Sequence, residues 1–213
     1  MTRLKCICIG LLCLARNGIA MAQAGQPGGK ADYAPTAGST PCPAADNRTL
    51  SAQKEQQALR DLFSPLETIV VATADAMPAD KYSFAPSNGE FKGVRTFGQQ
   101  VKHLAATNYI LAAAALGQDP PTGAGDETAP DIVRTKAEIL DYLNGSFASL
   151  GKAIDAIGNT EIPVEASPIS PLQADSVTRS ALIEEALIHA FDHYGQMVEY
   201  LRMNGVVPPA SRP

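Results

Sequence analysis

The sequence predicts an all-α protein folded as a four-helix bundle. Between residues 50 and 204, apolar side chains recur at three- and four-residue steps in four long stretches, a spacing that lines one face of a helix. Capping boxes, Gly and Pro mark where these stretches begin and end. No stretch alternates apolar and polar residues as a strand would, so long helices with long connections between them indicate a bundle.

The first helix is expected over residues 50–77, with Pro78 ending it. Its apolar stripe consists of Leu59, Leu62, Phe63, Leu66, Ile69, Val70 and Thr73. Residues 64–67, Ser-Pro-Leu-Glu, have the pattern of a capping box with Pro at the first helical position. We therefore expect this helix either to kink at Pro65 or to begin anew there.

The second and third helices each begin with a capping box, at Thr96–Gln99 and at Thr135–Glu138. In this motif the Thr side chain and the Gln or Glu side chain satisfy backbone N–H groups that have no partner within the helix. Gly117 and Gly158 are the expected stop signals, because Gly readily adopts the left-handed conformation that ends a helix.

The fourth helix is expected to begin near Ser176 or Thr178 and to end at Asn204-Gly205, since Pro208-Pro209 cannot continue it. A broad apolar arc on this helix comprises Ile183, Leu187, Tyr194, Val198 and Leu201. Part of that arc packs the bundle, and any excess is available to bury a partner subunit.

The first 22 residues have the order of a secretory signal peptide. Arg3 and Lys5 precede an apolar run over residues 6–15, and Ala20-Met21-Ala22 offers a small-residue cleavage site. The run is too short to span a bilayer, so we expect export to the periplasm or the medium without stable membrane insertion. A misassigned start or a retained anchor is the alternative. Residues 23–48, rich in Gly, Pro, Ala, Ser and Thr, are expected to be a flexible linker before a domain at 49–213.

Cleavage changes the charge and the cysteine count. The net charge of −5 becomes −8, because the signal carries Arg3, Lys5 and Arg16 and no acidic residue. Such an acidic chain argues against a nucleic-acid partner. Cys42 is the one Cys that remains, so an internal disulfide is excluded and stability must come from packing.

The chain has only three His, and all lie within expected helices. His189 and His193 are four residues apart and project from one helix face, and His103 lies near the middle of the second helix. If these helices face each other, the imidazoles converge in an arrangement that suits a divalent metal, and three ligands leave coordination positions open, as in catalytic sites. The alternative is a set of hydrogen-bonded core histidines without a metal.

Two acidic residues lie near the His pair on the fourth helix. Glu185, one turn before His189, is a candidate ligand, general base or orienting residue, and its alternative is a solvated helix acid. Asp192 is expected to face the polar side of the helix with Glu199 and Arg202.

These segments also resemble a known family. Residues 96–109, TFGQQVKHLAATNY, resemble the second-helix motif of the DinB-like (YfiT-related) metalloenzymes, and residues 189–196, HAFDHYGQ, resemble their H-x-x-x-H-x-G-Q signature. Residues 77–86 and 200–211 are similar to the loop and tail of that family. The resemblance covers about residues 50–211, which is essentially the whole expected domain.

The resemblance implies a four-helix bundle, usually a homodimer, with a divalent metal held by His103, His189 and His193. Zn, Ni, Mn and Fe all tolerate such imidazole sites. Some relatives are thiol-cofactor-dependent transferases or isomerases, and others are regarded as hydrolases. Export argues against the thiol-dependent branch, because low-molecular-weight thiols belong to the reducing cytosol.

We therefore expect an exported metal-dependent hydrolase or transferase that acts on a small molecule, with Glu185 as the candidate catalytic residue. The alternative is a non-catalytic helical module that binds a metal or another ligand. The position of the three imidazoles relative to a solvent-reachable pocket separates these two hypotheses.

Overall fold

A computed structural model describes residues 44–124, 127–158, 163–165, 169 and 176–213, with side chains described from Thr49 onward. The expected signal peptide at 1–22 and most of the expected linker lie outside the described residues. Within the described residues, no helix is both long enough and apolar enough to cross a membrane.

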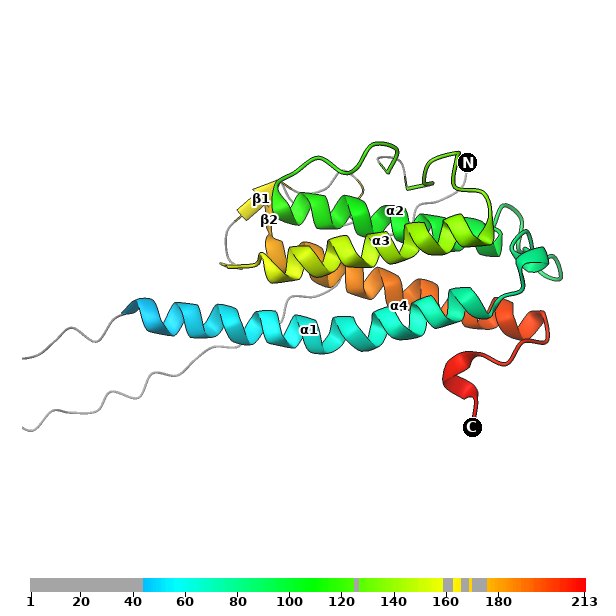
Figure 1. Cartoon of the computed structure of the whole chain (residues 1–213), viewed down its shortest axis with the longest axis horizontal. Coiled ribbons are helices and arrows are strands. Elements are labelled where there is room, and N and C mark those ends of the chain that lie inside the picture. The colour runs from blue at the N-terminus through cyan, green and yellow to red at the C-terminus, as the bar shows by residue number, and fades with distance from the viewer. Residues whose placement is uncertain (1–43, 125–126, 159–162, 166–168, 170–175) are drawn as a thin grey trace, which may run out of the picture. The chain divides into compact units, whose positions relative to one another are not determined.

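The described part of the chain contains four long helices that run side by side (Figure 1), which confirms the predicted all-α bundle. They are α1 (Ala44–Ala76), α2 (Phe97–Leu116), α3 (Lys136–Asp155) and α4 (Arg179–Met203). The main contacts of α2 are with α3 and α4, and α1 covers the same two helices from the other side. This packing brings the expected His-bearing helices, α2 and α4, into direct contact.

Helix α1 differs from the expectation at its start and in its middle. It begins at Ala44 rather than at Leu50, and it continues through Pro65 instead of beginning anew there. The apolar face explains the continuity, because Phe63, Leu66 and Val70 are all buried on both sides of the proline. Leu62 was predicted to lie on this face but is 56% exposed.

The predicted capping boxes at the starts of α2 and α3 are confirmed. In the first, the Thr96 hydroxyl accepts a hydrogen bond from the Gln99 backbone N at 3.2 Å, and the Gln99 side chain accepts one from the Thr96 N at 2.9 Å. Gly117 ends α2 with a φ of 66°, in the left-handed region that favours glycine. Helix α3 ends at Asp155, slightly before the expected Gly158.

Two short strands were not predicted. Strand β1 (Pro163–Glu165) pairs antiparallel with β2 (Ser176–Thr178), with Val164 opposite Val177. Three-residue strands are too short to show a hydrophobic alternation, which is why the sequence pattern misses them. Thr178 ends β2 and also caps α4, where its hydroxyl accepts from the Ala181 backbone N at 3.2 Å. The strand pair therefore leads directly into the start of α4.

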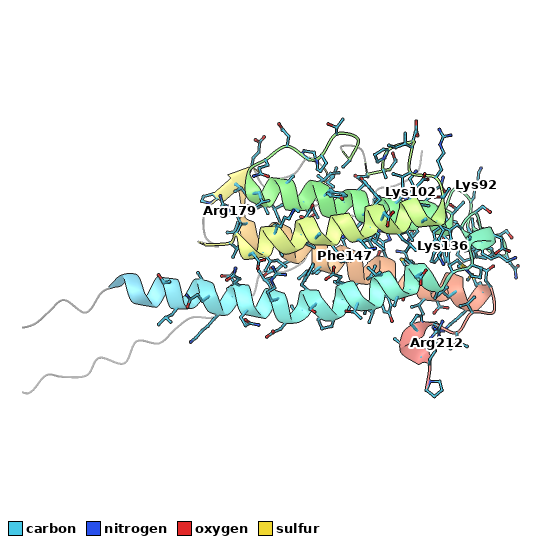
Figure 2. The ribbon with its side chains drawn as sticks, in the orientation of Figure 1. Lys92, Lys102, Lys136, Phe147, Arg179 and Arg212 are labelled. Atoms are coloured by element: carbon cyan, nitrogen blue, oxygen red, sulfur yellow. The ribbon has the colours of Figure 1, made fainter. Side chains whose placement is uncertain are left out.

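The core lies between the four helices and contains large side chains from each of them. The biggest side chains that are almost fully buried are Phe97, Phe147, Leu66, Met77, Leu104, Leu111, Leu143, Leu150, Ile154, Leu182, Ile183 and Met197. Figure 2 shows Phe147 between the ribbons, whereas Lys92 and Arg212 lie at the periphery. The apolar arc predicted on α4 is used within the chain, because Ile183 and Leu187 are buried against the other helices.

Candidate metal centre

The three histidines, distant in sequence, meet between α2 and α4. The His103 Nε2 lies 3.2 Å from the His189 Nε2, which lies 2.8 Å from the His193 Nε2. One ligand nitrogen from each residue lies within 4.8 Å of the others. The predicted convergence is therefore confirmed, and three imidazole nitrogens at this spacing could hold one metal ion.

Helix geometry and helix packing each account for part of this convergence. His189 and His193 are one turn apart on α4, so they share a face without any tertiary constraint. His103 reaches them because α2 packs against α4 along its length. His103 and His193 are each 6% exposed and His189 is half-buried, so the group sits at the edge of the core.

Burial keeps these imidazoles neutral at physiological pH. Desolvation, together with the neighbouring imidazoles, lowers the pKa of His189 to about 3 and the pKa of His193 to about 4. Desolvation also lowers the pKa of His103, against the opposing effect of its hydrogen bond to Glu127. The positive charge of Arg95 adds a smaller depression at all three residues. Neutral imidazole is the form that binds metal, so protons compete weakly for these nitrogens near pH 7.

A loop carbonyl orients the ring of His103. The His103 Nδ1 lies 2.9 Å from the backbone oxygen of Glu127, and because a carbonyl only accepts, Nδ1 carries the hydrogen. The His103 Nε2 then presents a lone pair to the centre. Glu127 and Ala129 have φ values of 57° and 67°, a conformation that residues other than Gly rarely adopt. The loop thus holds strained backbone where it touches the site.

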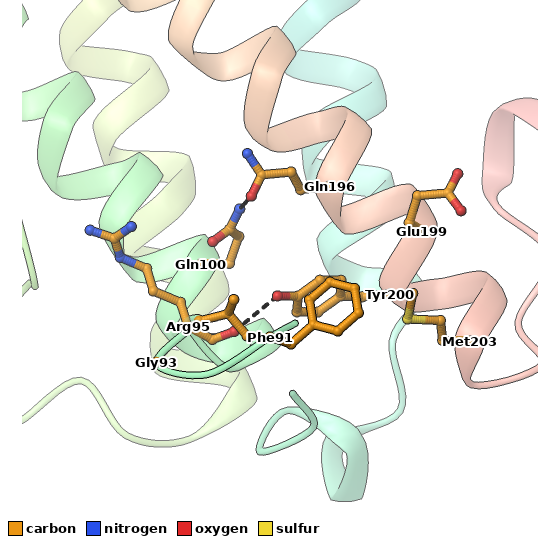
Figure 3. Close-up of a pocket in the computed structure, with 9 residues that line it drawn as sticks. Phe91, Gly93, Arg95, Gln100, Gln196, Glu199, Tyr200 and Met203 are labelled. Carbon is orange, nitrogen blue, oxygen red and sulfur yellow. Dashed lines mark hydrogen bonds between the residues drawn. The ribbon is translucent and has the colours of Figure 1, made fainter. Parts of the chain in front are cut away.

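A pair of glutamines contacts His193 from the other side. The Gln100 Nε2 lies 2.7 Å from the His193 Nδ1 and donates to the Gln196 Oε1 (Figure 3). The Gln196 Nε2 in turn donates to the Asp192 Oδ2 at 2.7 Å. Asp192 is exposed and faces the polar side of α4, as predicted, and its carboxylate is connected to His193 through two amides.

The fit of a metal to these residues rests on their nitrogen chemistry. The three rings supply borderline-soft nitrogen ligands in a number typical of catalytic zinc and related sites. The His189 Nδ1 is buried and has no hydrogen-bond partner in the described part of the chain, so no neighbour there holds its hydrogen or competes with the Nε2 that faces the other two rings. The residues present fit a divalent cation held by His103, His189 and His193.

Two cavities flank the centre and meet at Arg95. The larger, about 650 Å³, is lined by Arg95, Gln100 and Gln196 and by the rings of Phe91 and Tyr200 (Figure 3). The smaller, about 380 Å³, reaches His103 and is lined by charged side chains. Those charged residues are Arg95, Lys102, Glu127 and Asp131. Through His103, the histidine group therefore borders a space that solvent and a small molecule can enter, as the hypothesis of a catalytic site requires.

Glu185 does not belong to the converging group. It lies half-buried on α4, one turn before His189, and the set of ligand atoms that meet is formed by the three histidines. Its role as catalytic residue stays a prediction.

Three neighbours of the site were not predicted to have a role, namely Gln100, Arg95 and Glu127. Helix spacing could have identified Gln100, because it lies three residues before His103 on the same face of α2. The loop residue Glu127 has no periodicity to reveal it, although both its carbonyl, at 2.9 Å, and its carboxylate, at 3.6 Å, approach the His103 Nδ1.

Fold and site together define a helical bundle with a three-histidine group that could bind a metal ion. The family model of the DinB superfamily matches residues 54–197, and the chain belongs to this superfamily. A comparison with curated proteins gives no match.

Proposed function

We propose that this protein is an exported metalloenzyme, a metal-dependent hydrolase or transferase, with His103, His189 and His193 as its metal ligands. The observation that carries the proposal is the convergence of three neutral imidazoles beside solvent-reachable cavities. Membership in the DinB superfamily supports the same conclusion. The substrate is a small molecule, because the two cavities measure about 650 and 380 Å³.

A divalent cation bound here would supply Lewis-acid chemistry and lower the pKa of a coordinated water molecule. The chain's own residues hold and orient this centre. Glu127 fixes the His103 ring through its carbonyl, and Gln100 contacts the His193 ring. The smaller cavity is lined by two basic and two acidic side chains, so its lining suits a polar substrate group. Glu185 is the candidate for a proton-transfer role.

Export forms part of this proposal and rests on the sequence of residues 1–22, with its basic start, apolar run and small-residue cleavage site. An exported enzyme would meet substrates outside the cytosol, which favours hydrolysis over transfer to a low-molecular-weight thiol.

A second candidate function is a non-catalytic metal- or ligand-binding module. One observation favours it: among the described residues, the group of ligand atoms that converge includes no carboxylate. A general base in contact with the metal centre is therefore not part of that group.

Elemental analysis of the purified full chain tests the metal site. We expect about one divalent metal ion per chain in the wild type and its loss in His103→Ala and His189→Ala, because two imidazoles hold a divalent ion much more weakly than three. Glu184→Ala, an exposed position on α4, is the control and should retain the metal. Circular dichroism verifies that each variant is folded. Wild-type protein without stoichiometric metal, or unchanged metal in both His variants, would refute the site.

Turnover separates the two candidate functions. Metal-loaded wild type should hydrolyse members of a panel of esters, amides and phosphate esters, and His189→Ala should not. Stoichiometric metal with no turnover across the panel would favour the binding module.

A further inference from the structure

A chain of side-chain amides connects His193 to the surface of α4. Gln100 on α2 is only 2% exposed, and it contacts both the His193 Nδ1 and the Gln196 Oε1. Gln196 continues to the carboxylate of Asp192, 2.7 Å away. We call Gln100 and Gln196 the amide relay. A buried amide whose nitrogen faces the ring of a proposed ligand is in a position to control that ring.

The carboxylate sets the direction of the whole relay. Because a carboxylate only accepts hydrogen bonds, Gln196 turns its NH₂ group toward Asp192 and its oxygen toward Gln100. Gln100 must then turn its NH₂ group toward Gln196, and the same nitrogen lies 2.7 Å from the His193 Nδ1. The His193 Nδ1 therefore accepts, and the hydrogen of this neutral ring is on Nε2.

The Nε2 hydrogen of His193 points into the histidine group. The His193 Nε2 lies 2.8 Å from the His189 Nε2, close enough to donate a hydrogen bond to it. In this tautomer His193 has no lone pair for a metal at the centre. Ligation through Nε2 requires the hydrogen to be on Nδ1, where it would oppose the NH₂ group of Gln100.

Two amide rotations remove that conflict. If Gln100 turns, its oxygen accepts from the His193 Nδ1–H, but the same oxygen then faces the oxygen of Gln196. Gln196 must turn as well, and its oxygen then faces the carboxylate of Asp192. The hydrogen bond between Gln196 and Asp192 is therefore incompatible with the ligating tautomer of His193.

We propose that Gln100 is the positioning residue of His193, and that the amide relay, anchored by Asp192, selects which nitrogen of that ring carries the hydrogen and so opposes metal binding. The proposal rests on the proposed metal function and adds to it a residue that weakens the affinity. The ring stays neutral in both states, so the relay changes the tautomer and not the charge.

Asp192→Asn gives the sharpest test, because two physical effects predict opposite outcomes. Removing a negative charge near the site should weaken binding of a cation by Coulomb's law, and the Asp192 charge does reach His189. The relay predicts the reverse, since an Asn amide can donate to the Gln196 oxygen and stabilise the turned state. We expect Asp192→Asn to tighten Zn²⁺ binding by about threefold to tenfold, measured by competition with a chromophoric chelator. Unchanged or weaker binding would overturn the relay.

Substitutions at Gln100 give a spectroscopic readout that does not require the metal. Long-range ¹⁵N–¹H correlation spectra distinguish the two tautomers of His193 in protein stripped with a chelator. We expect the Nε2–H form in the wild type, and the Nδ1–H form in Gln100→Glu, whose carboxylate can only accept. Because that carboxylate stabilises the ligating Nδ1–H form, Gln100→Glu should also tighten Zn²⁺ binding by about tenfold or more relative to the wild type.

Gln53→Glu adds the same negative charge as Gln100→Glu, but at an exposed position on α1. It is the matched control for the tautomer spectra and for the Zn²⁺ affinity. A His193 ring in the Nδ1–H form in both stripped wild type and Gln100→Glu would refute the relay. If wild type binds no Zn²⁺, the proposed metal function fails, and the tautomer spectra of the stripped proteins still decide whether Gln100 controls His193.

Discussion

The three histidines are largely removed from water, and one of them, His103, also lines a cavity. Burial lowers the pKa of each ring and so keeps its nitrogens free of competing protons. An exposed histidine pair would lose metal affinity as soon as the pH fell below about 6.5. In this bundle the competition by protons begins at lower pH.

The same depressed pKa values predict how stability depends on pH in the metal-free protein. The pKa is about 3 for His189 and about 4 for His193 in the folded chain, against about 6.5 in an unfolded chain. The unfolded state binds more protons between these values, so the contribution of the two rings is complete above about pH 6.5 and is lost as the pH falls toward 4.

Urea denaturation between pH 4 and 8, in the presence of a chelator, measures this dependence. The free energy of unfolding should fall more steeply with decreasing pH in the wild type than in His189→Gln, because the substitution removes one group that titrates. Carboxylates titrate in both proteins, so the difference between the two slopes measures the contribution of the His189 ring alone. Equal slopes would contradict the prediction.

The three candidate ligands could be predicted from the spacing and position of the histidines in the sequence. The spacing of His189 and His193 places both rings on one helix face, and the position of His103 within an apolar stretch indicates a buried face. The backbone contact from Glu127 could not be predicted, because it depends on the path of a loop. The sequence also shows Gln100 beside His103, but its contact with His193 depends on how α2 and α4 are packed.

At the level of the helices, α4 has more apolar surface than the bundle covers. Ile188 is 70% exposed and Phe191 is 47% exposed, and they are three residues apart on one face of α4. Gly195, one further turn along, leaves open space around its Cα. The excess apolar surface expected on this helix exists, but it lies outside the predicted arc, whose members Ile183 and Leu187 are buried within the chain.

We predict that this face of α4 forms the homodimer that the family resemblance implies. Sedimentation equilibrium should give a dimer for the wild type and a monomer for the double variant Ile188→Glu, Phe191→Glu, because two buried charges would lose their hydration at the interface. Leu62→Glu, at an exposed apolar position on α1, is the control and should remain dimeric. A monomeric wild type at micromolar concentration would contradict the prediction.

The boundaries of the helices show where local signals are reliable. The capping boxes at Thr96 and Thr135 mark the starts of α2 and α3 correctly, because the reciprocal hydrogen bonds of this motif are local. A similar pattern at Ser64 did not begin a helix, since the apolar face of α1 continues through Pro65 and is buried on both sides. Tertiary burial outweighed the local capping signal there.

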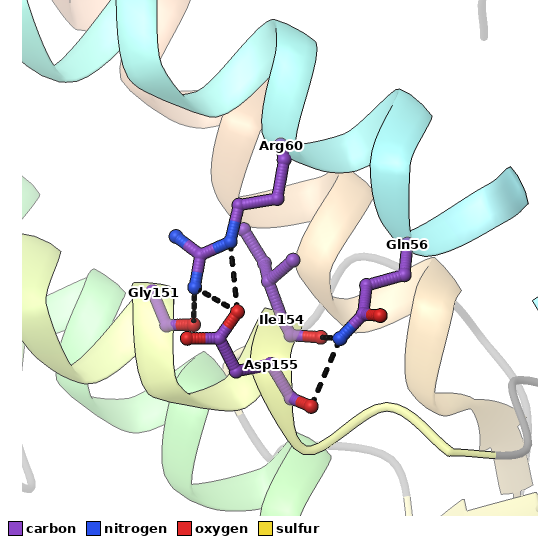
Figure 4. A network of polar contacts seen from close by, with 5 residues as sticks. All are labelled: Gln56, Arg60, Gly151, Ile154 and Asp155. Atoms are coloured by element: carbon purple, nitrogen blue, oxygen red, sulfur yellow. Dashed lines mark hydrogen bonds and ion pairs between the residues drawn. The ribbon is translucent and has the colours of Figure 1, made fainter. Parts of the chain in front are cut away.

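For the molecule as a whole, two kinds of contact join α1 to α3. Polar contacts lie near one end of the interface (Figure 4), where Arg60 pairs with Asp155 and donates to the Gly151 carbonyl. Next to it, Gln56 donates to the backbone carbonyls of Ile154 and Asp155. Apolar contacts lie deeper, where the rings of Phe63 and Phe147 are 6.0 Å apart. The side chain of Asp155 is 66% exposed, so water screens its ion pair.

We therefore predict that the core contact of Phe147 contributes more to the free energy of unfolding than the ion pair of Asp155 does. Phe147→Ala should lower the free energy of unfolding by about 3–5 kcal/mol, because it empties a fully buried site. Asp155→Asn should lower it by less than about 1 kcal/mol, as for other exposed ion pairs. Chemical denaturation followed by circular dichroism measures both, with Phe147→Leu as a milder core variant. A larger loss for Asp155→Asn than for Phe147→Ala would contradict this ranking.

The amino-acid pattern was sufficient for the helices, their capped starts and the candidate ligands, because apolar periodicity, capping and the i, i+4 spacing of two histidines are local properties of the chain. The meeting of His103 with the α4 pair, the depth of their burial, the amide relay and the cavities depend on how α2 packs against α4. The contacts between α2 and α4 join residues that are far apart in the sequence: His103 and His189 are separated by 86 positions, and Gln100 and His193 by 93. Contacts of that kind follow from side-chain packing in three dimensions, which no local pattern encodes.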